Sequence, residues 1–577
     1  MNSHRRINGA LSFSSRRLAI KSAFLSIGCL IFSSPTFAKK SHDKNTDTQQ
    51  KKKYKFDTII YAEKHGVVNS FSVDSSVIII KLLQEYSGCI IVLPPNFAVS
   101  RTIIYPKTCH IKGMDGTGSI CWILPGFSGT SVFEPEIKGK LSSLSVSFTN
   151  IIFNDLSAKN DGKGTTSIIN CIDITGTFAA RIKKIKGVRV NCVLYCEPGI
   201  EVQQTSRALI DDIDGSNVNY LIHFLPCNDD RLAYGDLYLT NIKTTGSIAN
   251  GVSIEDVDGI TWLGLVLFPN ASVRISGHYL NLTVCHPFEP KARLGQDMAS
   301  AEALYIPKRL GGGRSCYITI SNFVSAFAGR LADTTIGIPK LTNQGAFGIK
   351  VVNVTNFTLN AIVNDPSMGA LHLVNCENGV FTLASTNINT QKLGSGALAP
   401  GLYDVVLMQS CKQIIGTVTD SSPDKRFVIN MDDFCQGCCI DAVSSIGYAD
   451  IIPYRLPDNS NNIVRVLHSS SNGCIYYDSV NDKPTVIKAA LNSPLPGNKV
   501  HKKGCYLVFD NTQETLVSDL PGIEQYQDVY VNIQEDYTVL LDISHGGMFR
   551  LGGDNFKGKG NVLHLVRESS TGELIKL

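Results

Sequence analysis

Two similar segments of the sequence carry carboxylates at matching positions. Residues 210–215 read Ile-Asp-Asp-Ile-Asp-Gly and residues 254–259 read Ile-Glu-Asp-Val-Asp-Gly, so that Asp212 matches Asp256, 44 residues later. Stacked carboxylates repel one another, and they tend to share protons or to bind a cation such as Ca²⁺. We therefore expect chemistry between residues 206 and 260.

A second polar group lies between these segments and reads Asn228-Asp229-Asp230-Arg231. Two carboxylates could act as the acid and the nucleophile or base of a glycosidase. Alternatively, carboxylates could hold calcium while Arg231, or Arg207, accepts a proton in a lyase reaction. Turns also favour Asp and Asn, so a solvated turn is the competing interpretation for each single Asp.

These alternatives define three sets of candidate residues. The candidate catalytic residues are Asp212, Asp229, Asp230, Arg231 and Asp256. The candidate substrate-binding residues are Arg207, His223 and Tyr234. Calcium is the one cofactor that the pattern suggests, and its candidate ligands are Asp214 and Asp258.

The elements that must position these residues are visible as internal repeats. The segment 349–356 recurs as 371–378, displaced by 22 residues, and 406–413 repeats the pattern after a longer insertion. Each unit alternates apolar and polar residues and then turns, with Asn353 and Asn375 where the earlier segments have Asp212 and Asp256. A period of this size predicts solenoid coils that bury their apolar face against their neighbours.

The start of the repeat region has its own signal. Asp74-Ser75-Ser76 precedes an amphipathic stretch from Val77 to Tyr86, and hydrophobic strand patterns broken by Pro and Gly follow. A polar cap before such a stretch predicts a short helix. We expect this helix to cap the first coil.

The segment from about residue 59 to residue 123 resembles the opening of the pectate-lyase superfamily. The residues that carry the resemblance are His65-Gly66-Val67, Asp74-Ser75-Ser76, Leu93-Pro94-Pro95 and Gly113, whereas Asn96 stands where glycine is usual. The resemblance implies an all-β protein, a right-handed parallel β-helix, with an extended polysaccharide as its partner. Phage tailspikes in this superfamily form trimers, so the resemblance also allows a homotrimer.

The sequence divides into four parts. Residues 1–38 read as a signal peptide with a basic start, an apolar core and a small-residue end at Ala38, and residues 39–53 as a polar linker. Arg16-Arg17 leaves twin-arginine export and the general secretory route both open. Residues 54–450 are expected to form the β-helix and residues 451–577 a small antiparallel β module. The mature chain would then be periplasmic or extracellular.

Composition excludes two classes of protein. The 577 residues are 43% hydrophobic and 18% charged, which is too polar for a multispanning membrane protein, and we expect no membrane association once the signal is removed. The formal charge of +4 is small and much of the excess base lies in the first 53 residues, so nucleic acid is not an expected partner.

Cys376 and Cys411 occupy the same repeat position, which predicts a buried ladder of small side chains.

Two functions remain open from the sequence. The first is an exported enzyme, a polysaccharide lyase or a glycoside hydrolase, that binds an extended glycan along a groove of the β-helix. The second is a non-catalytic protein that binds glycan or builds a surface or matrix structure. The two are distinguished by whether Asp212, Asp229, Asp256 and Arg231 converge on one groove.

Overall fold

The computed structural model describes most of the chain after residue 57. The predicted signal peptide (1–38) and linker (39–53) lie outside the described residues. The described ranges are 58–136, 145–159, 164–198, 205–245, 248–267, 272–287, 302–326, 328, 346–388, 404–422, 425, 427–445, 454–456, 461–470, 473–479, 485–486, 505–509, 515–520, 528–533, 537–557, 562–568 and 571–577. No helix in these ranges is long and apolar enough to cross a membrane.

The only α-helix of the described residues, α2 (Ser76–Glu85), follows the 3-10 helix η1 (Ala62–His65). Its start is fixed by Asp74, whose Oδ1 accepts hydrogen bonds from the backbone N of Ser76 (3.0 Å) and of Ser100 (3.0 Å). Burial raises the pKa of Asp74, but hydrogen bonds from Ser76 and Ser100 outweigh this and hold it below its usual value. Ile79, Leu82 and Leu83 pack into the core of the β-helix, and the expected capping helix is confirmed.

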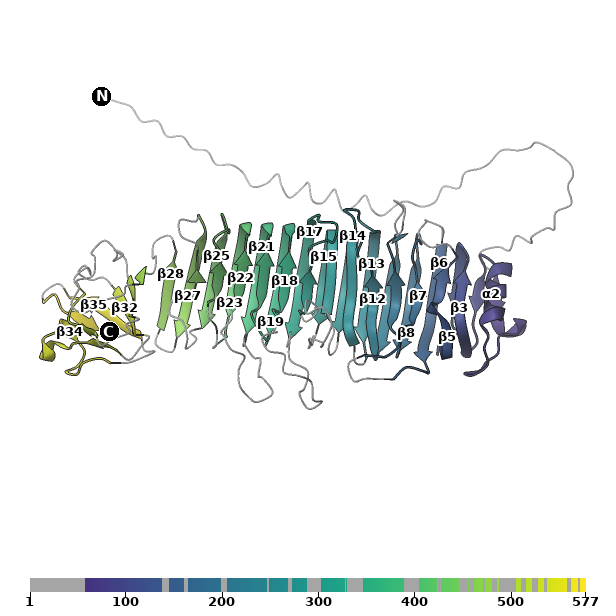
Figure 1. Ribbon diagram of the computed structural model, residues 1–577, viewed down its shortest axis with the longest axis horizontal. Helices are drawn as coiled ribbons and strands as arrows, with labels where there is room; N and C mark the ends of the chain where they lie inside the picture. Colours follow the sequence, from purple (N-terminus) through teal and green to yellow (C-terminus); the bar gives the residue numbers. More distant parts are fainter. Residues whose placement is uncertain are drawn as a thin grey trace, which may run out of the picture. The chain divides into compact units, whose positions relative to one another are not determined.

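Twenty-eight strands form one continuous sheet that winds through successive coils, with strands stacked side by side from purple to green in Figure 1. All pairings in this sheet are parallel except β27–β28, so the predicted parallel β-helix is confirmed. Parallel pairing continues past residue 450, as far as β27. The strands are β1 (Ile59–Tyr61), β2 (Ile90–Val92), β3 (Asn96–Tyr105), β4 (Thr108–Lys112), β5 (Ser119–Pro135), β6 (Ser145–Asp155), β7 (Asn170–Asp173), β8 (Arg181–Val188), β9 (Cys192–Cys196), β10 (Thr205–Ser206), β11 (Leu209–Ser216), β12 (Val218–Phe224), β13 (Tyr234–Thr244), β14 (Ile248–Leu267), β15 (Ser272–Pro287), β16 (Leu304–Ile306), β17 (Ser315–Ala326), β18 (Ile349–Val352), β19 (Val354–Asn364), β20 (Leu371–Val374), β21 (Glu377–Thr386), β22 (Val406–Gln409), β23 (Lys412–Asp420), β24 (Ile429–Met431), β25 (Cys439–Ser445), β26 (Tyr454–Arg455), β27 (Ile463–Ser470) and β28 (Gly473–Asp478).

Side chains of equivalent residues stack from coil to coil and fill the interior. One buried column runs through Leu239, Trp262, Leu282, Ile320 and Leu359, each paired in register with the next. The predicted cysteine ladder is also present, because Cys376 and Cys411 are buried thiols at equivalent positions. This continuous packing is what a single coil could not achieve alone.

The bends between strands form regular rows. At one bend of each coil, one residue adopts the left-handed conformation in register with its counterparts on the neighbouring coils, and this conformation costs most L-residues about 1–2 kcal/mol. We call these residues the first corner row: Ala179, Arg207, Asp236, Gly259, Tyr279, Tyr317, Asn356, Asn378, Gln413 and Gly437. Gly, Asn and Asp tolerate this conformation best, which explains the turn residues of the sequence repeats.

The C-terminal residues form a second, smaller sheet with its own core, which includes Val531, Leu540, Phe549 and Leu565. The sequence predicted an antiparallel module, and β32–β35 and β35–β36 pair in that way. The pairs β29–β30, β30–β32 and β34–β36 are parallel, so the sheet is mixed, and this corrects the prediction. The strands are β29 (Thr485–Val486), β30 (Cys505–Phe509), β32 (Asp528–Ile533), β34 (Phe549–Arg550), β35 (Val562–Arg567) and β36 (Leu574–Lys576), with β31 (Thr515–Val517) and β33 (Thr538–Leu540) paired beside them and the 3-10 helix η5 (Ile543–His545) between strands.

Candidate functional site

The short strands of successive coils carry a line of aromatic and basic side chains at one register position. Each residue of the line pairs in register with the next, and all are partly exposed except Ser253, which is buried. Neighbouring strands lie about 4.8 Å apart, so the line offers one side chain per strand spacing. We call it the short-strand row: Tyr195, His223, Ser253, Arg274, Tyr305, Lys350 and His372.

The middle of this row combines positive charge with an aromatic ring. The Arg274 guanidinium lies 5.2 Å from the centre of the Tyr305 ring, and the Lys350 ammonium lies 5.6 Å from the same ring. Arg274 Nε also donates to Oε1 of the buried Glu255 (2.7 Å), which fixes the guanidinium in place. Such cation–π and ion-pair contacts orient long side chains that would otherwise be mobile.

One end of the row contains a histidine that is neutral at physiological pH. His223 stacks on Tyr220 at a centroid distance of 3.9 Å and meets the Tyr195 ring edge-on at 6.0 Å. Burial, and to a lesser degree the charge of Arg274, lowers the pKa of His223 to about 4. The lowered pKa leaves the imidazole free to accept a proton and also makes it a weaker base than an exposed histidine, so a cation that stabilises the product of proton transfer would have to assist it.

The Tyr195 hydroxyl beside it keeps its proton. It donates to Oε1 of Glu197 at 3.0 Å, and burial together with this carboxylate raises the Tyr195 pKa well above its usual value. At the far end of the row, burial lowers the pKa of His372, whose Nε2 shares a hydrogen bond with Oε1 of Gln409 (2.8 Å). The row therefore holds a proton acceptor, a proton donor and two cations.

The structure brings several of the predicted residues together, but around a buried ion pair. Arg309 Nε donates to Oδ1 of Asp256 (2.6 Å), and the backbone N of Cys227 donates to Oδ2 (2.7 Å). Arg309 Nη2 also donates to the backbone carbonyls of Asp230 (2.7 Å) and Arg231 (2.8 Å). Asp256 is 0% exposed, with both oxygens engaged. Asp256 therefore has a structural role, because its ion pair joins the loop of Arg309 to the loop of Asp230 and Arg231. This corrects the catalytic role predicted for it.

Asp229 and Arg231 lie on the surface of the same loop and bind each other. Arg231 Nε donates to Oδ2 of Asp229 at 2.7 Å, and the backbone N of Arg231 lowers the pKa of the Asp229 carboxyl. The Asp229 carboxylate in turn raises the pKa of Arg231, which is the opposite of what a proton acceptor needs. Asp230 is exposed beside them. The loop shows no arrangement that would make Arg231 a base.

The carboxylates of β11 lie elsewhere on the coil, and each has a lysine partner. Lys243 Nζ lies 2.7 Å from Oδ1 of Asp212, and Lys186 Nζ lies 2.9 Å from Oδ2 of Asp214. Asp212 itself sits at a left-handed bend with φ 58°, as Asp256 does. Asp212 therefore satisfies turn geometry, and both carboxylates pair with lysines of neighbouring strands.

The two candidate calcium ligands do not lie together. Asp214 is in register with Lys243 of β13, whereas Asp258 is in register with Gly235, at the other end of the same strand. No group of three or more His, Cys, Asp or Glu side chains is placed to hold a metal ion among the described residues. The donor set thus does not fit a calcium site, and we derive no reaction step through a metal.

The predicted substrate-binding residues have three different environments. Arg207 is exposed in the first corner row and lies 5.1 Å from the centre of the Phe178 ring. His223 belongs to the short-strand row. Tyr234 is 0% exposed and donates its hydroxyl to the carbonyl of Leu225 at 2.7 Å. Because the Tyr234 ring is part of the core, it has no surface for a ligand, which corrects the role predicted for it.

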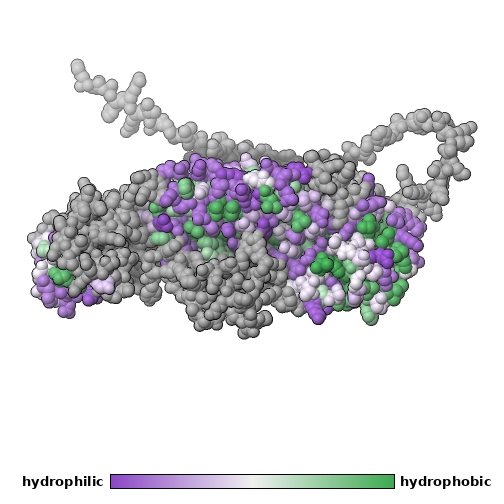
Figure 2. All heavy atoms as spheres, in the orientation of Figure 1, coloured by the Kyte–Doolittle hydropathy of each residue, from purple (hydrophilic) through white to green (hydrophobic). Residues whose placement is uncertain are grey.

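Apart from His223, sequence reasoning missed the short-strand row. Part of its signal lies in the aligned repeats, where Lys350 and His372 both occupy the second position of the unit, between apolar residues. Figure 2 shows that hydrophilic side chains dominate the described surface in that view, with hydrophobic ones between them. A polar surface of this kind suits a hydrated ligand better than a large apolar partner.

Comparison with known proteins finds similar solved structures and no sequence relative. No family model matches the chain, and no curated protein sequence matches it. Solved structures that resemble it are parallel β-helix proteins. The A-module of mannuronan C-5 epimerase AlgE6 from Azotobacter vinelandii is 9% identical with a TM-score of 0.42, and the match covers 71% of this chain and 99% of that one.

Two further structures are similar to the same degree. Pre-mature gene product 12 of bacteriophage phi29 is 12% identical with a TM-score of 0.45, covering 78% of this chain and 62% of its own. The family 28 exopolygalacturonase of Yersinia enterocolitica is 8% identical with a TM-score of 0.36, covering 70% and 78%. At this level of identity and TM-score the likeness carries no functional argument, so function has to be argued from the residues themselves.

Proposed function

We propose that this protein binds an extended acidic polysaccharide across the coils of its β-helix, along the short-strand row. The observation that carries the proposal is the register of Tyr195, His223, Arg274, Tyr305, Lys350 and His372, which follow one another from coil to coil with only the buried Ser253 between His223 and Arg274. A polymer lying across the strands would meet a new side chain at each coil. The aromatic rings would contact sugar faces, and the cations would pair with uronate carboxylates.

We further propose that the protein acts on this polymer by β-elimination at the His223 coil. His223 would take the proton from C5 of a uronate, and the electron pair would form the C4–C5 double bond as the C4–O bond breaks. The Tyr195 hydroxyl would protonate the departing oxygen. Arg274 would stabilise the negative charge that develops on the carboxylate, as oriented cations do in such reactions.

Hydrolysis has less support than elimination. A hydrolase needs two carboxyl groups facing one glycosidic bond. Of the predicted carboxylates, Asp212, Asp214 and Asp229 are held in ion pairs with basic side chains, and Asp256 is buried. The neutral imidazole of His223, by contrast, lies among partly exposed side chains of the row.

Export is part of the same proposal. The basic and apolar start of the chain, ending at Ala38, would direct it to the periplasm or the exterior, where polysaccharides are found. A homotrimer stays a prediction from the superfamily resemblance. Neither alters the chemistry of the row.

The test is an incubation of the mature chain with polygalacturonate, alginate and a neutral glucan, with and without a chelator. We expect unsaturated products from an acidic polymer, unaffected by the chelator, and their loss in the His223→Gln variant. Binding should be assayed in parallel by affinity electrophoresis in gels that contain each polymer. Binding without products would leave a non-catalytic glycan-binding protein, and binding of none of the acidic polymers would overturn the proposal. Products that consist only of new reducing ends would indicate hydrolysis instead.

A further inference from the structure

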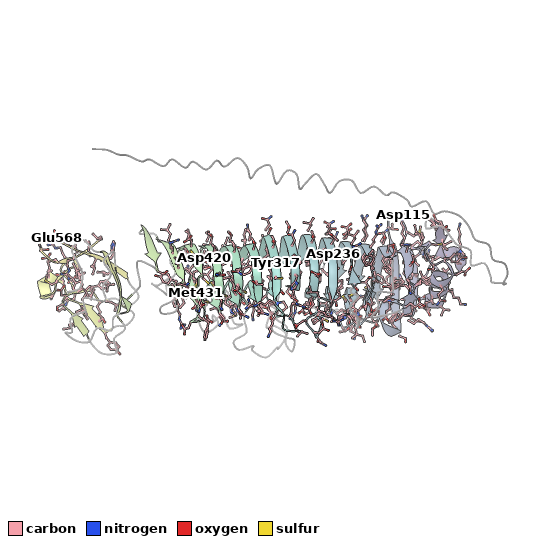
Figure 3. All side chains as sticks on the ribbon, turned by 90° about the horizontal axis from the view of Figure 1, so that it is seen from above. Asp115, Asp236, Tyr317, Asp420, Met431 and Glu568 are labelled. Atoms are coloured by element: carbon pink, nitrogen blue, oxygen red, sulfur yellow. The ribbon has the colours of Figure 1, made fainter. Side chains whose placement is uncertain are left out.

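The first corner row contains two tyrosines where its other members are small or polar. Tyr279 (φ 52°) and Tyr317 (φ 57°) occupy consecutive coils, and they are 59% and 53% exposed. Their rings stack with centroids 5.1 Å apart and planes 6° from parallel. A bulky side chain in the left-handed region is unusual, and such outliers often mark functional sites. Figure 3 labels Tyr317 and Asp236, two members of this row.

The two neighbours of Tyr279 in the row differ in size. On the side away from Tyr317 the row continues with Gly259 and then Asp236, each in register with the next. Gly259 has no side chain, so the row places nothing beside that face of the Tyr279 ring. A Cβ at Gly259 would lie 3.2 Å from Oδ1 of Asp236, and the nearest atoms around it all belong to Asp236. The Asp236 carboxylate therefore lies against Gly259, and Tyr279 stands on the other side of this glycine in the same row.

This combination of groups matches the chemistry of a sugar ring. The C–H face of a pyranose stacks on an aromatic face, and its hydroxyl groups donate hydrogen bonds to a carboxylate. Asp236 and Asp258 are both exposed at this bend, and their charge would repel an anionic sugar. The geometry points to a second carbohydrate site, in which Tyr279, Gly259 and Asp236 hold one neutral pyranose unit. We call it the corner notch.

The corner notch does not depend on the proposed function of the short-strand row. On β14, Ser253 of the short-strand row and Gly259 of the corner notch are separated by the left-handed bend at Asp256. The two sites also have opposite chemistry, since the row carries Arg274 and Lys350 whereas the notch carries carboxylates. Each can therefore be tested without the other.

The experiment is saturation-transfer NMR on the full mature chain with cellohexaose, laminarihexaose and mannohexaose, and with hexagalacturonate as the acidic comparator. We expect at least one neutral hexamer to give a signal. Tyr279→Asn should weaken its binding about tenfold, because the ring that stacks on the sugar is lost. Asn already occupies this row at Asn356 and Asn378, so this variant should fold, and circular dichroism would check it. Tyr279→Phe keeps the ring and should retain binding.

Two matched variants complete the test. Asp236→Asn keeps the side-chain size but removes the charge, and it should weaken the neutral hexamer several-fold. Tyr238→Ala removes a tyrosine that is 49% exposed on the same strand as Asp236 but outside the row, and it should have no effect. The inference fails if no neutral hexamer binds, or if Tyr279→Asn binds like the unmodified protein. It also fails if hexagalacturonate binds in a Tyr279-dependent way and the neutral hexamers do not.

Discussion

The short-strand row and the first corner row are built by the same repeat, yet they carry different chemistry. In the short-strand row the backbone is extended, so any side chain is allowed, and the row uses His, Arg, Tyr and Lys. In the first corner row every residue is left-handed, and the row uses mainly Gly, Asn, Asp and other polar residues. Where the backbone restricts the residue type, an Asp or Asn reports geometry, and only the exceptions, Tyr279 and Tyr317, suggest a ligand.

The largest expected effect concerns the buried ion pair between Asp256 and Arg309. Asp256→Ala would leave the buried Arg309 without its carboxylate, and we expect a loss of about 3–5 kcal/mol of stability. Urea unfolding followed by circular dichroism measures this. Asp441→Ala, which breaks the exposed pair with Arg465, should cost no more than about 1 kcal/mol. A similar small loss for Asp256→Ala would show that the two loops hold without their anchor.

The next effect tests whether the short-strand row binds the acidic polysaccharide. Lys350→Ala removes one charge-assisted contact, and we expect acidic polysaccharide to bind about 10- to 100-fold more weakly. Lys412→Ala removes an exposed lysine beside the corner residue Gln413 and should leave binding unchanged. Affinity electrophoresis compares the two. Equal losses in both variants would mean that overall charge, and not the row, holds the polymer.

The third effect tests the lowered pKa of His223 through the pH dependence of stability. Because the pKa of His223 is about 4 in the fold and near 6.5 when unfolded, the unfolded chain binds the extra proton first as pH falls. The contribution of His223 to stability is therefore complete above pH 6.5 and is lost as pH falls from 6.5 to 4. We expect the unfolding midpoint to fall less between pH 7 and pH 5 in His223→Gln than in the unmodified chain. Parallel pH curves for the two proteins would disprove the lowered pKa.

The smallest expected effect lies in the corner row itself. Tyr279→Asn removes a stacked ring worth about 0.5–1.5 kcal/mol and also relieves left-handed strain of similar size, so stability should change by less than about 1 kcal/mol. Tyr317→Asn provides the matched variant on the next coil. Thermal unfolding of both measures the balance. A large loss would mean that the tyrosine pair is a structural element, and the two tyrosines would then no longer point to a ligand.

The sequence predicted the architecture well because the coil repeat is local. The helix expected from Val77 to Tyr86 is α2, and the 22-residue step between 349–356 and 371–378 is the register of β18 with β20. The match of Asp212 with Asp256 predicted chemistry because stacked carboxylates repel and tend to bind a cation. The strand register instead puts the two residues at different bends, since Asp212 lies between the partners of Thr240 and Ile242, whereas Asp256 precedes Val257, the partner of Tyr234. Both are left-handed with φ 58°, a conformation that Asp tolerates, so each reports bend geometry.

The short-strand row was harder to find, because insertions of different length separate its members. Consecutive residues lie from 21 positions apart, between Ser253 and Arg274, to 45 apart, between Tyr305 and Lys350. No fixed period connects them, and only strand pairing brings them into line. Similarly, Arg309 joins Asp256 across 53 residues, so nothing in the local sequence marks that pair.

The register of β18, β20, β22 and β24 has a consequence for how such a chain can change in length over evolution. Ile349 pairs with Leu371, Leu371 with Val406 and Val406 with Ile429, so one whole coil can be duplicated or deleted without mismatching the columns. Deleting a single residue within a strand instead turns every later side chain of that strand to the opposite face. Insertions and deletions should therefore accumulate as entire coils or in the loops between strands, and each added coil would lengthen the surface by one strand spacing.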